Sequence, residues 1–272
     1  MLNIEKIKSA LKTNNELVSE VRYFEKIDST NLFSKSIEED GVLVLTDFQT
    51  QGMGRMKRKW ESEKGMNLTF TIKKSFEVDT RHKQSVNFFF TYFLLAYLKD
   101  FIAKKLKAVA NFPELKIKWP NDILLDSKKI CGLLIENTVN KNEFVIGIGI
   151  NVNQESFPPE FDYKTTSLKN CLGYEIDTTD LLIHLIDIFT KNLYFLKKQK
   201  YRLIFNLWKN NTDLIGKEVL FAENSEDTKS GKIIDLLENG GLKMEINKNI
   251  RTFYSGEIKL VHGKRGRLTV QP

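Results

Sequence analysis

Two segments of the chain combine residue types that could carry chemistry. Lys118–Glu136, KWPNDILLDSKKICGLLIE, places a polar cluster and a lysine pair between apolar runs that are typical of adjacent strands. Gln49–Trp60, QTQGMGRMKRKW, follows another strand-like run. Its glycines let backbone N–H groups approach a ligand, and its cations can neutralise phosphate charge. We therefore expect this loop to close over an anion.

Each of these signals also has a plain structural interpretation. A basic glycine loop can be a solvated hairpin tip, and the pair Lys128–Lys129 can be an exposed turn. Asn121 and Asp122 can form only an Asx-type turn after the proline. The apolar run that follows Lys129 favours a position on the sheet face, where Gly132 leaves room for a ligand. The glycines of 147–153 indicate either a ligand or another backbone close to that strand, and both remain open.

The elements that must position these residues follow from apolar periodicity. Strands are predicted over 21–27, 42–48, 66–73, 115–119, 123–125, 130–137 and 144–152, with a turn over 126–129. Helices are predicted over 28–39, 83–109 and 178–209. The fold class is α+β, a mixed, mostly antiparallel sheet backed by helices. From Gly216 onward, short strands and turns predict a small β-barrel, with a boundary near Thr212.

Composition limits the class of protein. The 272 residues carry a formal charge of +7, but lysine is spread along the chain, so charge alone does not indicate DNA binding. We expect no membrane span, because the most apolar stretch is shorter than about 20 residues. No secretory signal is visible, so we expect a cytoplasmic protein. The two cysteines should be reduced, and no His or Cys cluster has metal-ligand spacing.

Five motifs occur in a specific order. They are SerThrAsn at 29–31, QTxGxGRxxRxW at 49–60, KWPND at 118–122, KKxxGxLxE at 128–136 and GIGINVN at 147–153. Together they resemble the biotin protein ligases, over about residues 22–262. The resemblance implies a catalytic domain over 1–212 with a fold like that of class II aminoacyl-tRNA synthetases. It also implies an SH3-like barrel over 213–262, followed by a basic tail over 263–272.

The resemblance further implies two half-reactions. Members of the family activate biotin with ATP and Mg²⁺ to biotinyl-5′-AMP. They then transfer the biotinyl group to one lysine of the biotin carboxyl carrier protein of acetyl-CoA carboxylase. ATP and biotin would be substrates here, and the carrier domain would be the protein partner. We expect a monomer or homodimer.

Site residues follow from the motif positions. The catalytic set would be Lys129, Arg55 and Asp122. The biotin-binding set would be Ser29, Thr30, Asn31, Gln49, Gly52, Met53, Gly54, Arg55, Lys129 and Gly132. The ATP-binding set would be Arg55, Arg58, Trp60, Lys118, Asn121 and Asn151. Met53 and Lys57 depart from the family pattern, where an arginine and a glycine are usual, so loop closure is expected to differ.

Two other functions compete with this interpretation. A lipoate protein ligase has a similar fold, but its RRxxGG and HDxGN patterns are absent, and the Trp of KWPND favours biotin. A basic nucleic-acid-binding regulator would fit the charge, but the sequence shows no recognition helix.

Only about 20 residues precede the catalytic domain, so we expect no winged helix-turn-helix and no specific DNA binding.

Overall fold

A seven-stranded sheet forms the centre of the larger of two units, Met1–Thr212; the smaller unit is Asp213–Pro272. The computed structural model describes residues 1–11, 15–106, 112–137, 142–158, 164–223 and 228–260, so the predicted basic tail lies outside the described residues. The strands are β1 (Glu20–Phe24), β2 (Val42–Thr46), β3 (Leu68–Ser75), β4 (Leu115–Lys118), β5 (Asp122–Leu125), β6 (Lys128–Asn137) and β7 (Glu143–Ile150).

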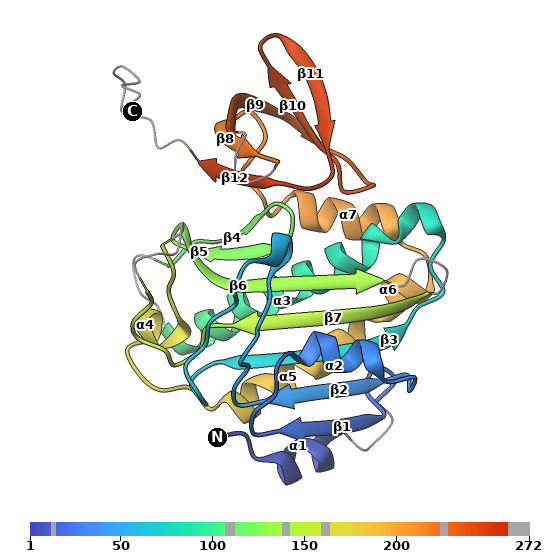
Figure 1. Cartoon of the computed structure of the whole chain (residues 1–272), viewed down its shortest axis with the longest axis vertical. Coiled ribbons are helices and arrows are strands. Elements are labelled where there is room, and N and C mark those ends of the chain that lie inside the picture. Colours follow the sequence, from blue (N-terminus) through green and yellow to red (C-terminus); the bar gives the residue numbers. More distant parts are fainter. Residues whose placement is uncertain (12–14, 107–111, 138–141, 159–163, 224–227, 261–272) are drawn as a thin grey trace. The chain divides into compact units, whose positions relative to one another are not determined.

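The order of strands in the sheet is β1-β2-β3-β7-β6-β5-β4 (Figure 1). β1 and β2 are parallel, and the other neighbouring strands are antiparallel. Strands β2, β3 and β7 are almost wholly buried, which explains their apolar runs. The predicted mixed, mostly antiparallel sheet is confirmed.

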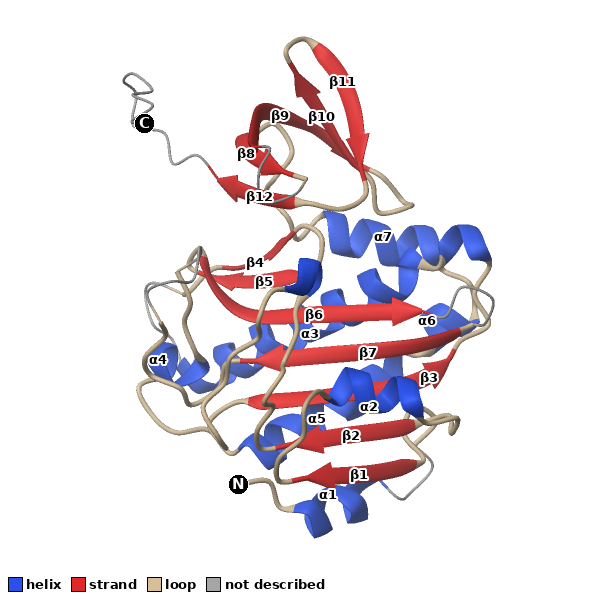
Figure 2. Ribbon diagram, viewed as in Figure 1, coloured by secondary structure: helices blue, strands red, loops and turns tan. Residues whose placement is uncertain are grey.

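Helices lie on both faces of the sheet (Figure 2). They are α1 (Ile4–Leu11), α2 (Thr30–Ser36), α3 (Gln84–Leu106), α4 (Leu168–Leu172), α5 (Thr178–Asn192), α6 (Tyr194–Lys197) and α7 (Tyr201–Lys209). α3 and α5 lie behind the sheet in Figure 2, and α2 lies in front of it. The segment Thr80–Leu106 has the length and hydropathy of a membrane span, but most of it is buried inside the protein. It is the core helix of this unit.

The prediction of one helix over 178–209 is wrong. The segment forms three helices, and between the last two Gln199 adopts a φ of 51°. A left-handed residue ends a helix, and the surrounding lysines offer no apolar face to continue it. The break allows α7 to pack its own apolar face on α3, with the Phe88 ring centroid 4.6 Å from that of Trp208.

Register pairing places residues of one sheet face in rows across the strands. One row runs from Thr69 through Gly149 and Gly132 to Asp122 and Lys118. Side chains two apart along a strand share a face, so the next row contains Thr71, Gly147 and Leu134. Three glycines therefore lie together on the face that carries α2. We call Gly132, Gly147 and Gly149 the glycine floor.

The smaller unit is an antiparallel sheet of five strands in the order β11-β10-β9-β8-β12. These are β8 (Glu218–Ala222), β9 (Thr228–Leu236), β10 (Leu242–Ile246), β11 (Asn249–Phe253) and β12 (Glu257–Leu260). Asn247 and Lys248 connect β10 and β11 with φ of 51° and 62°, as a tight hairpin requires. Its buried side chains include Val219, Phe221, Ile233, Met244 and Ile258. This sheet is consistent with the SH3-like barrel that was expected.

The cap of α5 gives a test of local stability. The Asp177 carboxylate accepts hydrogen bonds from the backbone N–H groups of Thr179 and Asp180, at 2.8 and 3.1 Å. Asp177→Ala leaves both donors without this acceptor, so we expect a loss of about 1 kcal/mol in the free energy of unfolding, measured by urea denaturation. The control is Asp187→Ala, which removes an exposed pair with Lys191 and should change little. Equal losses would contradict the assignment of the cap.

Candidate functional site

The N-terminus of α2 is joined to the start of the glycine-rich loop. Ser29 is the N-cap, and its hydroxyl accepts a hydrogen bond from Leu32 N–H at 3.4 Å. Thr30 donates from its backbone N–H and its hydroxyl to Gln49 Oε1, at 2.8 and 3.0 Å. Two predicted biotin-site residues from separate motifs are thus in direct contact.

Asn31 lies directly on the glycine floor. A Cβ at Gly147 would fall 2.1 Å from Asn31 Oδ1, so only glycine fits there. Asn31 Oδ1 accepts from Thr71 Oγ1 at 2.7 Å, and Thr71 Oγ1 is also 2.7 Å from Thr30 Oγ1. Thr71 was not among the predicted residues. The signal that could have found it is its place on β3, directly opposite Gly147 in the register.

A β-bulge turns Lys129 onto the same face. The register between β5 and β6 shifts so that Ile123 pairs with Cys131 and Leu124 with Lys129, which leaves Ile130 as an extra residue. Strict alternation would direct Lys129 away from the face of Gly132. With the bulge, Lys129 Nζ lies 2.8 Å from Asp122 Oδ1, and a Cβ at Gly132 would lie 3.1 Å from Nζ. The hypothesis that Lys129 faces the sheet surface is therefore consistent with the structure.

Trp60 covers another part of the glycine floor. A Cβ at Gly149 would fall 2.3 Å from Trp60 Cζ2, and Lys129 Nζ lies 5.7 Å from the centroid of the indole ring. Among the described residues, the buried polar atoms without a hydrogen-bond partner include Trp60 Nε1 and Thr69 Oγ1. Thr69 pairs with Gly149 in the register. A buried polar atom without a partner costs free energy. Such atoms on this face therefore favour a ligand that would form hydrogen bonds with them.

The loop from Gln49 to Trp60 crosses this face of the sheet (Figure 1). Its two arms are joined by hydrogen bonds from Gly54 N–H to Arg58 O at 2.7 Å and from Trp60 N–H to Gly52 O at 2.8 Å. At its far end is the 3-10 turn η1 (Arg55–Lys57), where Arg55 Cζ lies 5.7 Å from the centroid of the Trp119 ring. The loop thus carries Arg55 to the connection between β4 and β5, where the KWPND motif lies.

The predicted nucleotide residues differ in how they are placed. Asn121 Nδ2 donates to Leu133 O, and Asn151 Nδ2 donates to Thr166 O at 3.1 Å. Thr166 N–H in turn donates to Lys129 O at 2.9 Å, so Asn151 supports the strand that carries Lys129. Both asparagines and Lys118 are buried, whereas the side chain of Arg58 is exposed, as is that of Met53 from the predicted biotin-binding set. The side-chain amide nitrogens of both asparagines thus donate hydrogen bonds to backbone carbonyl groups.

Cys131 lies on β6, the strand that carries Lys129. Its side chain belongs to the sheet face opposite the glycine floor. It is fully buried between Ile130 and Gly132, and burial raises the pKa of its thiol well above the usual range. Cys131 and Cys171 are both free thiols in the described part of the chain. A buried neutral thiol is a poor nucleophile, so Cys131 is not suited to act as one.

Comparison with known proteins shows the family. Residues 23–153 match the sequence model of the biotin/lipoate A/B protein ligase family, and all five motifs fall within this range. Residues 23–153 therefore form a domain of that family. The bifunctional ligase/repressor BirA of Bacillus subtilis is 31% identical over 226 residues, which are 81% of this chain and 66% of that protein. This chain therefore spans just under two thirds of the length of that relative.

Two further relatives show the extent of the similarity. The biotin–[acetyl-CoA-carboxylase] ligase of Mycobacterium tuberculosis is 32% identical over 129 residues, which cover 47% of this chain and 45% of that protein. The structure of the biotin protein ligase from Aquifex aeolicus in complex with biotin and ATP matches with a TM-score of 0.70 and 25% identity. That match covers 90% of this chain and 100% of the other.

The glycine floor gives a test of site geometry. In Gly149→Ala the new methyl group would meet the Trp60 ring, whereas in Gly132→Ala it would meet the end of the flexible Lys129 side chain. We expect Gly149→Ala to displace the indole and shift the tryptophan emission spectrum, and Gly132→Ala to leave the spectrum close to that of the wild type. A Trp60→Phe background should abolish the shift. An unchanged spectrum in Gly149→Ala would contradict the described contact.

Proposed function

We propose that this chain is an ATP-dependent biotin protein ligase. It activates biotin to biotinyl-5′-AMP and transfers the biotinyl group to a lysine of the biotin carboxyl carrier protein of acetyl-CoA carboxylase. The observation that carries the proposal is the position of Lys129, paired with Asp122 at the glycine floor and next to Trp60. The names of the relatives support the same reaction.

In the first half-reaction two anions must meet. A carboxylate oxygen of biotin forms a bond to the α-phosphorus of ATP, and the bond to the pyrophosphate oxygen breaks. Lys129 on β6 and Arg55 in the loop are the cations that offset the repulsion and hold the groups in line. Thr30, Asn31 and Gln49 would bind the other end of biotin, with Ser29 capping the helix that carries Thr30 and Asn31.

Mg²⁺ would enter with the nucleotide. In the described part of the chain, His, Cys, Asp and Glu form no group of three that could hold a metal ion. Mg²⁺ is usually held by one or two carboxylates together with substrate phosphates, so this residue set suits an ion that the ATP phosphates mainly hold. Bound there, it would neutralise phosphate charge.

The loop must also protect the product. Biotinyl-5′-AMP is a mixed anhydride that water hydrolyses, so its lifetime depends on a cover that excludes solvent. Gly52, Gly54 and the turn at Arg55 place the loop over the face of the sheet, with Trp60 at its base. Met53 and Arg58 are exposed on the loop.

In the second half-reaction the carrier lysine nitrogen forms an amide bond with the biotinyl carbonyl, and AMP leaves. An amine with a reference pKa of about 10.4 must first lose a proton. Asp122 is the carboxylate on this face next to Lys129, and we assign it the role of orienting the amine and accepting that proton.

All of these residues belong to the larger unit, so we assign catalysis to residues 1–212 and an accessory role to the SH3-like unit over 213–262. The expected cytoplasmic location, the monomeric or dimeric state and the lack of specific DNA binding stay predictions.

The direct test is pyrophosphate exchange that depends on ATP and biotin. It should be followed by mass spectrometry of an added carrier domain, with the carrier lysine replaced as a control. Because the family includes lipoate ligases, lipoate is offered in parallel. Exchange with biotin and modification of the carrier lysine are expected. Exchange with lipoate alone would assign the other acid, and no exchange with either acid would contradict the proposal.

The lysine pair provides a matched comparison. Lys129→Ala removes the ammonium group at the glycine floor, and we expect the adenylation rate to fall by about 10²- to 10³-fold, as when one preorganised electrostatic group is lost. Lys128→Ala removes an exposed charge one residue away and should leave the rate near that of the wild type. The measurement is the initial rate of pyrophosphate exchange at saturating substrates. Equal effects would show that net charge rather than position matters.

Asp122 can be tested separately from adenylation. Asp122→Asn keeps the side-chain shape but removes the basic oxygen, so transfer from preformed biotinyl-5′-AMP should slow and its rate should depend more steeply on pH. Single-turnover transfer to the carrier domain measures this step alone. Transfer at the wild-type rate would exclude the proposed role.

A further inference from the structure

We infer that Glu136 is a positioning residue that makes the biotin pocket ready to accept hydrogen bonds. It does so from outside the pocket, by fixing the side-chain amide of Asn31. The inference rests on the proposed function, since it concerns the part of biotin that does not react. Glu136 is the last residue of the KKxxGxLxE motif and had no predicted role.

The amide of Asn31 is held in one orientation. Asn31 Nδ2 donates to Leu134 O and to Glu136 Oε2, each at 3.2 Å. Both partners are acceptors, so the opposite orientation would place Asn31 Oδ1 against two oxygens with no hydrogen between them. Asn31 is buried, with 7% of its surface exposed, so water does not compensate. Asn31 Oδ1 must therefore face Thr71.

In this orientation four oxygen atoms make a chain of three successive contacts, but only two hydrogens are available for them. The contacts are Asn31 Oδ1 to Thr71 Oγ1 at 2.7 Å, Thr71 Oγ1 to Thr30 Oγ1 at 2.7 Å and Thr30 Oγ1 to Gln49 Oε1 at 3.0 Å. The amide oxygens at the two ends cannot donate, and the two hydroxyls supply two hydrogens for three contacts. One oxygen pair is left without a hydrogen, so the chain favours a ligand that brings an N–H group.

The reversed amide would remove this property. Asn31 Nδ2 would donate to Thr71, Thr71 to Thr30, and Thr30 to Gln49, which gives three hydrogens for three contacts. The chain would then be saturated and would offer no acceptor that needs a donor. The ring urea of biotin carries two N–H groups, so it matches the unsaturated chain. Glu136, together with Leu134 O, thus selects the orientation that binds a urea.

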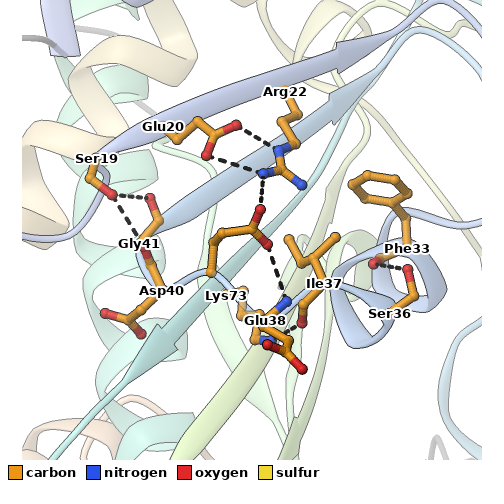
Figure 3. Close-up of polar contacts among 11 residues, drawn as sticks. Ser19, Glu20, Arg22, Phe33, Ser36, Ile37, Glu38, Asp40, Gly41 and Lys73 are labelled. Atoms are coloured by element: carbon orange, nitrogen blue, oxygen red, sulfur yellow. Dashed lines mark hydrogen bonds and ion pairs between the residues drawn. The ribbon is translucent and has the colours of Figure 1, made fainter.

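Other contacts keep α2 fixed while Glu136 acts. Lys35 Nζ pairs with Glu136 Oε1 at 2.7 Å, on the edge exposed to solvent. At the C-terminal end of the helix, the buried Lys73 Nζ donates to Ile37 O, and Arg22 bonds Glu39 in the following segment at 2.7 Å (Figure 3). Cations at the C-terminal end also suit the helix dipole. Loss of Glu136 removes the Lys35 pair and one of the two acceptors of Asn31 Nδ2, so Leu134 O alone holds the amide. The contacts of Lys73 and Arg22 do not involve Glu136 and keep the helix in place.

The test compares Glu136→Ala with Lys35→Ala by calorimetry of biotin binding without ATP. Biotin methylated on either ring nitrogen is the second ligand. Glu136→Ala should bind biotin roughly tenfold more weakly, which corresponds to about 1.4 kcal/mol. Methylation should weaken binding to the wild type and have a smaller effect in Glu136→Ala. Lys35→Ala keeps the acceptor and should stay within about twofold of wild type in both measurements. The KM for ATP should not change in any variant.

The outcomes separate the two proposals. If the wild type does not bind biotin, the proposed function is wrong and this inference with it. If the wild type binds biotin and Glu136→Ala binds it equally well, the inference is wrong and the proposed function stands. An equal loss for biotin and its methylated forms in Glu136→Ala, or a matching loss in Lys35→Ala, would indicate a general structural effect and would also overturn the inference.

Discussion

The close approach of a helix and an indole ring to the centre of a sheet is the constraint on which the site depends. Side chains normally stand between a sheet and anything that covers it. Here Gly132, Gly147 and Gly149 leave that layer open, so Asn31 and Trp60 lie against the backbone itself. This brings the N-terminus of α2, the base of the loop and Lys129 onto one small area of the face.

The site is also a product of register. Five strands contribute to a single row of residues that ends at Asp122 and Lys118. The row exists only because the register of each antiparallel pair is aligned with that of the next pair. The buried apolar side chains fix this register, because a slip of one residue would turn them to the other face of the sheet. The polar residues therefore meet in a preorganised arrangement, which is what adenylation of a carboxylate requires.

Much of the fold and of the site could be predicted from the sequence. Apolar alternation or apolar runs marked the strands, and the capping residues over 28–30 marked the start of α2 because capping is a local interaction. Thr71 and Glu136 were missed as site residues because their roles arise from partners 40 and 105 positions away from them in the chain. The break at Gln199 was missed because an amphipathic pattern can continue across a turn when both helices pack on the same core.

The bulge at Ile130 has a wider implication for how such a site can change. Lys129 reaches the open face because one surplus residue offsets the alternation of β6. An insertion or deletion of one residue between Lys129 and Gly132 would turn an ammonium group into the hydrophobic interior beneath the sheet. The spacing of this motif is therefore constrained as strictly as its chemistry: substitutions here can be gradual, whereas changes of length cannot.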